Sequence, residues 1–367
     1  MRIRWLAHSL VSDWNHGNAH FLRGIVRELL RRGHDVQVYE SRTAWSRVEL
    51  VREQGEGAVG AFRTAFPSLR PRLYDLETID LEHETRDADL VVVHEWNEPW
   101  LVNELGRIRE GGAPFVLLFH DTHHRAVTAP EQMLRFQVRP YDGVLAYGRA
   151  LAQVYRERGW ARRAWVWHEA ADVELFRPLP TDERDGDIVW IGNWGDEERT
   201  RDLDEFLIEP VRRLRASGSV YGVRYPQDAV RRLERAGLRY RGWLANHRAP
   251  AAFARHRATV HVPRRPYVEA LPGIPTIRPF EALACGIPLV SAPWPDLEGL
   301  FEPGKDYLVA RDANEMGEQL RTVLRDPSLA SSLARHGRRT ILERHTCAHR
   351  VDELLTIVRE LEQAEAA

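Results

Sequence analysis

Short apolar runs alternate with amphipathic stretches from one end of the chain to the other, a pattern that predicts parallel strands connected by helices. In the first half, strands are expected at residues 3–8, 36–39, 90–94, 115–120, 143–147 and 165–168. Between the first two of these runs, residues 19–32 place their apolar side chains at helical spacing. Gly33 follows, at the position where many helices end. These segments predict a β-α-β unit.

The second half repeats the pattern, with strands expected at residues 188–192, 219–223, 240–243, 259–262, 288–291 and 307–310. Residues 177–187 contain prolines and charges without a period, which is typical of a linker. A last helix over residues 346–363 carries an apolar stripe and must pack on another element. We therefore predict an α/β protein with two Rossmann-like domains facing across a cleft, residues 1–178 and 186–345, followed by a C-terminal helix at 346–367.

The composition narrows the class of protein. Of the 367 residues, 43% are hydrophobic and 29% are charged, so each domain can build a core and a disordered chain is excluded. The net charge of −2 disfavours a protein that binds nucleic acid over its whole surface, and leaves a local basic groove open. Two cysteines exclude a disulfide framework and a thiolate zinc site. Because no apolar run approaches the length of a membrane span and residues 1–7 do not resemble a signal peptide, we expect a cytoplasmic protein.

The most informative stretch, residues 272–290, predicts a glycine loop, a short helix and a buried strand. Thr276 is a suitable N-cap, and Pro279 is tolerated in the first turn of a helix. Free N–H groups and the positive end of the helix dipole at that turn would suit a phosphate group. Glu281 lies one turn further along, where its carboxylate could accept hydrogen bonds from a ribose. The alternative, a surface glutamate on an ordinary helix, stays open at this point.

This stretch resembles the C-terminal motif of retaining GT-B glycosyltransferases of the family-4 type, especially their CgeB-like (spore-maturation) branch. Other segments resemble the same family in the same order along the chain. They are His16-Gly17-Asn18, Phe119-His120-Asp121-Thr122, residues 171–178, residues 190–195 with Arg199 after them, and residues 242–244. The resemblance implies the GT-B fold, with the C-terminal helix packing back on the N-terminal domain.

The resemblance also implies what the protein binds. A nucleoside-diphosphate sugar is expected on the second domain, and its sugar is transferred with retention, without metal or cofactor. The acceptor could be a saccharide, a lipid-linked sugar, a protein or a small molecule. The sequence leaves the acceptor, the sugar and the nucleobase open.

Individual roles are carried over onto matching positions. His120 and Arg199 are expected to be catalytic: the imidazole hydrogen-bonds the transferred sugar at a strand end, and the guanidinium binds the leaving diphosphate. The expected donor-binding residues are Gly192, Asn193, Trp194, Arg224, Gly242, Trp243, Gly273, Ile274, Pro275, Thr276, Arg278 and Glu281. On the acceptor side we expect His16, Gly17, Asn18, Trp96 and Asp121.

One position departs from the family pattern, which commonly has two glutamates eight positions apart. Eight positions before Glu281 stands Gly273, and Glu269 is nearby at a different spacing. This departure keeps open a non-catalytic protein that binds a nucleotide sugar. A nucleotide-sugar epimerase is a further alternative, but it needs acid and base carboxylates over the sugar. Glu95, Asp121 and Glu269 form no convincing pair in the sequence.

Two other classes of site receive less support. His120, Asp121, His123 and His124 are close in sequence, but they lack the helical histidine pair of zinc enzymes, so no metal site is predicted. Of the three Asp-x-Asp pairs, those at 87/89 and 185/187 precede strands, and the pair at 202/204 is expected to open a helix. A dinucleotide-dependent dehydrogenase is disfavoured because no Gly-x-Gly-x-x-Gly follows the first strand.

Overall fold

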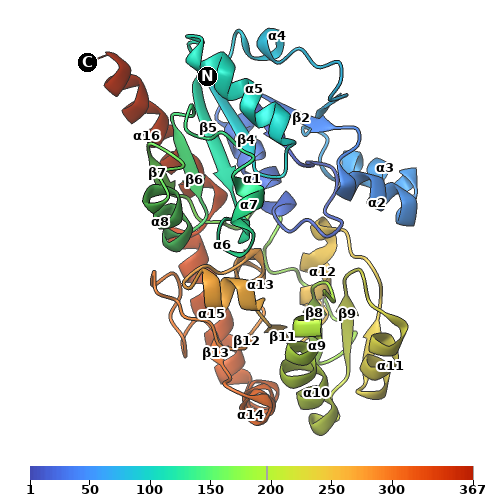
Figure 1. The fold of residues 1–367 in the computed structure, drawn as a ribbon. Coiled ribbons are helices and arrows are strands. Elements are labelled where there is room, and N and C mark those ends of the chain that lie inside the picture. The colour runs from blue at the N-terminus through green and yellow to red at the C-terminus, as the bar shows by residue number, and fades with distance from the viewer. Residues whose placement is uncertain (196, 367) are drawn as a thin grey trace. The chain divides into compact units, whose positions relative to one another are not determined.

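The computed structural model describes residues 1–195 and 197–366. The chain divides into two compact units, one formed by Met1–Glu169 with the segment from Cys347 onward, the other by Ala170–Thr346. Both units are α/β, and Figure 1 labels their elements. The chain leaves the first unit after Glu169, before the predicted linker at 177–187.

The first unit is built on a parallel sheet in the order β3-β2-β1-β4-β5-β6-β7. Its strands are β1 (Arg2–Ala7), β2 (Asp35–Ser41), β3 (Arg72–Tyr74), β4 (Leu90–His94), β5 (Val116–Asp121), β6 (Gly143–Ala146) and β7 (Ala164–Val166). The central strands are apolar over most of their length and fully buried, as expected for a sheet covered on both faces. The register of β4 and β5 sets His94 opposite His120.

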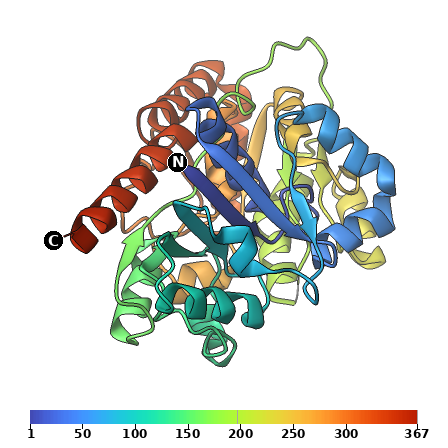
Figure 2. The same ribbon diagram turned by 90° about the horizontal axis from the view of Figure 1, so that it is seen from above.

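Helices cover this sheet: α1 (Ala19–Arg31), α2 (Trp45–Gln54), α3 (Glu56–Ala65), α4 (Leu81–Thr85), α5 (Pro99–Glu110), α6 (Arg125–Thr128), α7 (Pro130–Met133), α8 (Arg149–Glu157) and α16 (Cys347–Ala366). After α1, Gly33 takes a φ of +82°, which confirms the expected helix end. Helix α16, red in Figures 1 and 2, packs against α1. The carbonyl of Arg350 accepts a 2.8 Å hydrogen bond from Trp167 Nε1. The predicted return of the C-terminal helix to the N-terminal domain is thus confirmed.

The second unit contains a parallel sheet in the order β10-β9-β8-β11-β12-β13. Its strands are β8 (Ile188–Ile191), β9 (Gly218–Tyr221), β10 (Leu238–Tyr240), β11 (Ala258–His261), β12 (Leu289–Ser291) and β13 (Leu308–Val309). The elements between and after them are α9 (Glu197–Leu203), the π-helical η1 (Asp204–Ile208), α10 (Glu209–Leu214), α11 (Gln227–Arg235), the 3₁₀ turn η2 (Asn246–Arg248), α12 (Ala249–Ala254), the π-helical η3 (Pro266–Ala270), α13 (Ile277–Ala284), α14 (Ala313–Arg325) and α15 (Pro327–Arg344). In both sheets the first strand lies between the second and a later one, so the strand order reverses beside it. In open α/β sheets, ligands bind at the carboxyl ends of the strands at this point.

The structure corrects several sequence-based details. Strand β3 was not predicted because its residues, Arg72, Leu73 and Tyr74, do not form an apolar run. The Asp-x-Asp pair at 202/204 does not open a helix, since Asp202 lies near the end of α9 and Asp204 begins η1. Thr276 precedes α13 as expected, but its side chain makes no capping hydrogen bond. None of the described helices is both long enough and apolar enough to cross a membrane.

Candidate active site

The loop between β1 and α1 is held by two buried charged residues that sequence reasoning missed. Glu40 is fully buried, and its carboxylate accepts hydrogen bonds from the backbone N–H groups of Leu10 at 2.8 Å and Val11 at 3.1 Å. Arg23 is 2% exposed and donates to the carbonyls of the same two residues and to Asp13. Buried charges need such partners. Their positions in the sequence could have indicated that both are buried, since Arg23 lies among the apolar residues of a helix and Glu40 lies near the end of a strand.

Five rings, here called the ring cluster, gather at the carboxyl ends of β1 and β4: His8, His16, Trp45, His94 and Trp96. Ring centroids are 4.9 Å apart for His8 and His16, 4.7 Å for His8 and Trp45, and 6.1 Å for Trp45 and Trp96. Two of the rings, His16 and Trp96, were predicted on the acceptor side. Trp45 was missed because it lies at the start of α2, after β2, and its own segment follows neither β1 nor β4.

Burial keeps the imidazoles of this cluster uncharged. It lowers the pKa of His8 and of His94 to about 3, and the pKa of His16 well below its usual value, with nearby positive charge acting in the same direction. Neutral imidazoles donate and accept hydrogen bonds, and indole faces stack on apolar sugar faces. The ring cluster is therefore chemically suited to a carbohydrate.

His120 lies behind this cluster and is 1% exposed. Its ring centroid is 5.0 Å from that of Trp167, 5.3 Å from His94 and 5.9 Å from Phe21. Neither ring nitrogen has a hydrogen-bond partner among the described residues. A buried polar group without a partner is rare in proteins, so this imidazole has hydrogen-bonding capacity left for a bound molecule.

Glu95 and Asp121 form a buried pair of carboxyl groups at the ends of β4 and β5, with 0% and 1% exposure. Burial raises the pKa of each to about 7, and the charge of Glu95 further raises the pKa of Asp121. Tyr155 donates a 2.6 Å hydrogen bond to Asp121, and Thr122 donates one of 3.2 Å to Glu95. The sequence offered no convincing carboxylate pair, but the pairing of β4 with β5 creates one.

The remaining acceptor-side predictions lie beside these groups. Asn18 donates a 3.3 Å hydrogen bond to Glu169, and Gly17 is exposed. Arg125 stacks on Trp96, with its guanidinium carbon 3.9 Å from the ring centroid, and donates to the carbonyl of Glu95. Across residues 1–195 and 197–366, no group of three or more histidine, cysteine or acidic side chains has the arrangement of a metal site.

In the second unit, hydrogen bonds join the three predicted loops after β8, β9 and β10. Gly222 donates to the carbonyl of Gly242 at 2.9 Å, and Val223 donates to the side chain of Asn193 at 2.9 Å. A Cβ atom on Gly222 would lie 2.0 Å from the oxygen of Gly192, so only glycine fits there. Arg224, which is exposed, takes a φ of +65°, a strained value for a residue other than glycine.

Two tryptophans predicted near the donor differ in their surroundings. Trp194 is 3% exposed and packs in the core of the unit, so its side chain is not available to a ligand. Trp243 is half-buried and follows Gly242, which has a φ of +74°.

Two arginines concentrate positive charge at the carboxyl end of β11. Arg199 is 7% exposed, donates to the carbonyl of Val262 and lies over the ring of Trp190. Burial, Arg199 and Arg278 together lower the pKa of His261 to about 3, so both guanidinium groups act on this one imidazole. An arginine stays protonated even when buried. Two permanently charged side chains therefore act at the end of β11.

Glu281 lies on α13 in the same region and is fully buried, which excludes the alternative of a surface glutamate. Its Oε1 accepts a 2.6 Å hydrogen bond from Asn246, and its Oε2 pairs with Arg278. The loop before α13 contains Gly273, with a φ of +95°, and the buried Ile274 and Pro275. Asn246 was not predicted, because its contact with Glu281 forms only when η2 reaches α13.

Two protein-family models match the sequence, one in the first half of the chain and one in the second. Residues 17–175 match the model described as Glycosyltransferase Family 4, and residues 199–356 match the model described as Glycosyl transferase-like. No curated protein sequence is significantly similar to the chain.

Several solved structures share the fold over nearly their full length. Sucrose-phosphate synthase from Thermosynechococcus elongatus is 15% identical, with a TM-score of 0.68, over 99% of this chain and 100% of that one. HepE from Anabaena, in complex with UDP and glucose, is 14% identical with a TM-score of 0.69, over 98% and 99% of the two chains. An alpha-glucosyltransferase in complex with UDP and DNA is 12% identical with a TM-score of 0.69, over 98% and 99%. The fold is therefore GT-B.

Proposed function

We propose that the protein transfers a sugar from a nucleoside diphosphate to an acceptor hydroxyl, because two glycosyltransferase models match its sequence and its fold is GT-B. The transfer proceeds with retention, as the match to Family 4 suggests, and without metal. The observation that carries the proposal is the group formed by Arg199, Arg278 and Glu281 at the end of β11.

Each member of this group suits one part of the donor. The diphosphate is anionic, and two permanent cations can bind its oxygens in a bidentate way. Glu281 uses one oxygen for Asn246 and the other for Arg278. A carboxylate offers about four lone-pair sites, so it can still accept hydrogen bonds from ribose hydroxyls. Backbone groups at Gly242 and Trp243 follow β10 at the same edge of the sheet, where they could contact the nucleobase.

Charge at the leaving diphosphate explains why neither a metal nor an enzymic base is required. Negative charge develops there as the glycosidic bond breaks, and fixed cations lower that barrier. A divalent ion would supply the same stabilisation, so it is redundant when arginines provide it. In a front-face transfer the departing phosphate takes the acceptor's proton. Arg199 is the arginine we assign to this role.

The acceptor side is assigned to the first unit. The ring cluster offers neutral hydrogen-bonding groups and indole faces to the acceptor. His120, whose ring nitrogens have no hydrogen-bond partner among the described residues, is assigned to the transferred sugar. These groups fit a sugar hydroxyl better than a charged ligand.

A nucleotide-sugar epimerase is the second candidate, and the Glu95–Asp121 pair is the observation in its favour. Two carboxyl groups with a pKa of about 7 could exchange protons with a sugar at neutral pH. A non-catalytic protein that binds nucleotide sugars is the third, because Gly273 replaces the first glutamate of the family pattern.

One experiment separates these functions. The protein is incubated with UDP-glucose, UDP-galactose and UDP-N-acetylglucosamine in turn, with and without EDTA, and the anomeric protons are followed by NMR. UDP-sugars come first because HepE and the alpha-glucosyltransferase are complexes with UDP. We expect release of UDP and an initial α-configured sugar product, unaffected by EDTA. A β-configured product would refute retention, and activity lost with EDTA and restored by Mn²⁺ would refute metal independence. A new UDP-sugar without UDP release would identify an epimerase, and binding without turnover a non-catalytic protein.

A further inference from the structure

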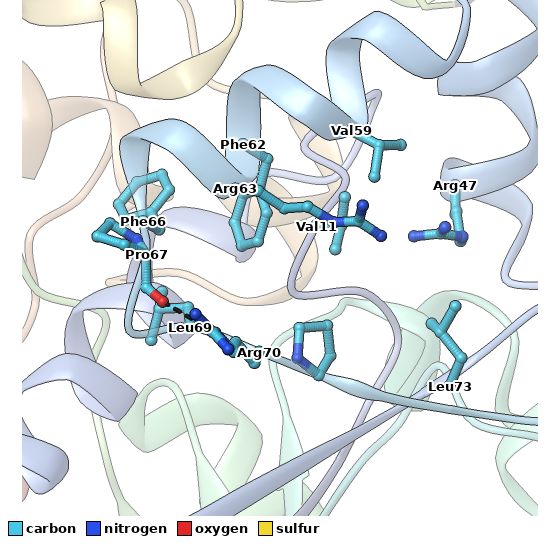
Figure 3. A pocket seen from close by; sticks show the side chains of 11 residues that line it. Val11, Arg47, Val59, Phe62, Arg63, Phe66, Pro67, Leu69, Arg70 and Leu73 are labelled. Atoms are coloured by element: carbon cyan, nitrogen blue, oxygen red, sulfur yellow. Dashed lines mark hydrogen bonds between the residues drawn. The ribbon is translucent and has the colours of Figure 1, made fainter.

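A cavity of about 390 Å³ lies in the first unit, outside the candidate active site. Figure 3 shows it between α3, the segment that leads into β3, and Arg47 of α2. Its volume is within the range of roughly 300–1,000 Å³ that is typical of small-molecule sites. No residue of the cavity was predicted to have a function.

The cavity has apolar walls. Helix α3 contributes Val59 and Phe62, each at most 3% exposed, and Phe66 just beyond the helix is equally buried. Leu69, from the segment leading into β3, and Leu73, within β3, complete the apolar surface. Apolar area that a ligand removes from water contributes about 25 cal/mol per Å² to its binding. The walls therefore favour a ligand with an aliphatic chain or ring.

The rim of the cavity is basic. Arg47, Arg63 and Arg70 line it, and its lining includes no acidic residue. In Figure 3 the guanidinium groups of Arg47 and Arg63 point toward each other. The Oε1 atom of Glu40 lies 3.3 Å from Nη1 of Arg47, so this carboxylate offsets the charge of Arg47. Among the described residues, the Arg70 side chain donates to the neutral carbonyl of Pro67 and has no acidic partner. Arg63 has no hydrogen-bond or ion-pair partner among the described residues. The rim thus carries positive charge that an anion would neutralise.

We propose that this cavity binds an amphipathic anion, a molecule with an apolar chain or ring and one carboxylate or phosphate head. The apolar part lies against Phe62, Phe66 and Leu69, and the head lies between Arg47 and Arg63. The inference does not depend on the proposed glycosyl transfer, because none of these residues belongs to the candidate active site.

The cavity is also connected to the loop between β1 and α1. Val11 lines it, and the backbone of Val11 is the segment that Glu40 and Arg23 hold. The guanidinium carbon of Arg23 lies 5.0 Å from the ring centroid of Phe62 and 5.2 Å from that of Phe66. A ligand against these two rings therefore packs on the layer that supports the loop carrying His16, so its binding should stabilise the first unit.

The test uses the full chain and three ten-carbon probes below their micelle concentrations: decyl phosphate, decanoate and decanol. Binding is measured by isothermal titration calorimetry, and stabilisation by the rise in melting temperature. We expect saturable one-to-one binding of at least one anion, at least tenfold tighter than that of decanol, and weaker at high ionic strength. Preference for the phosphate or the carboxylate identifies which head group the site takes.

Arg63→Glu reverses the charge at an exposed position, so the variant should fold. We expect it to weaken binding of the anion at least tenfold and to leave UDP binding unchanged. The matched control is Arg162→Glu, at an exposed arginine of the same unit that does not line the cavity. It should change anion affinity less than twofold. The proposal is overturned if neither anion binds, if decanol binds as tightly, or if Arg63→Glu and Arg162→Glu have equal effects.

Discussion

Replacing Glu281 by glutamine tests the donor site most directly, because it removes one negative charge and leaves the shape of the side chain almost unchanged. The wild-type carboxylate is fully buried between Asn246, at 2.6 Å, and Arg278. Glutamine can keep the bond from Asn246 through its carbonyl oxygen. It cannot pair with Arg278, and its amide group donates where the carboxylate accepted.

The structure sets the size of the expected effect. If Glu281 accepts a hydrogen bond from a ribose hydroxyl, the loss is that of a bond to a charged group, about 1.5–3 kcal/mol. This corresponds to a rise in Kd of roughly 10- to 150-fold. Stability falls as well, because Arg278 loses the anion that it pairs with. Breaking a fully buried pair costs about 3–5 kcal/mol, and we expect the lower end because the Arg278 side chain is 18% exposed.

The assay is calorimetric titration with UDP at a temperature where circular dichroism shows every variant folded. Glu318→Gln, at an exposed glutamate on α14 of the same unit, is the matched control and should bind UDP like the wild type. If Glu281→Gln proves unfolded, Asn246→Ala serves instead and should weaken UDP binding by a smaller factor. A folded Glu281→Gln variant with an unchanged Kd would remove this glutamate from the site and refute the reasoning.

Three further outcomes are expected. Arg199→Ala should lower kcat about 100-fold or more in an assay of UDP release, because its charge acts on the leaving diphosphate; a change in KM alone would make it a binding residue. His120→Ala should lower kcat/KM while leaving the calorimetric Kd for UDP nearly unchanged, and a lost UDP affinity would place His120 in the donor site. Glu95→Gln should stabilise the fold increasingly as pH rises from 4.5 to about 7, by up to roughly 3 kcal/mol in urea titrations. Over this range the wild-type carboxyl group ionises in the unfolded state while burial keeps it protonated in the native state, so rising pH favours unfolding of the wild type alone. A pH-independent effect would show that the carboxyl group of Glu95 does not titrate in this range.

Much of the fold was predictable, because long apolar runs are required wherever a strand is buried on both faces. Strand β4 was predicted to the residue, whereas β3, which has three residues, was missed. The ends of other strands shifted by a few residues, since hydrogen bonding to neighbouring strands, and not local composition, decides where pairing stops.

Contacts within the candidate site were less predictable, for reasons that differ from residue to residue. The Glu95–Asp121 pair could have been found, because adjacent parallel strands bring their carboxyl ends to one edge of a sheet. The contact of Asn246 with Glu281 could not have been predicted, because it depends on how the chain brings the 3₁₀ turn η2 next to α13. The cavity beside α3 depends on how Phe62, Phe66 and Leu69 leave a gap, and no sequence pattern encodes a gap.

The same topological position in the two sheets carries opposite electrostatics, and this difference supports the division of roles. Beside β1 the histidines of the ring cluster are uncharged, because burial lowers the pKa of His8 and His94 to about 3, and the carboxyl groups of Glu95 and Asp121, with a pKa of about 7, stay partly protonated at neutral pH. The arginines there already have partners: Arg23 pairs with Asp13, and Arg125 stacks on Trp96. Beside β8 the groups include Arg199 and Arg278, which no protein environment deprotonates. A diphosphate needs permanent cations, whereas a sugar hydroxyl needs neutral partners. This difference is why we propose the donor on the second unit and the acceptor on the first, from the chemistry of each unit taken by itself.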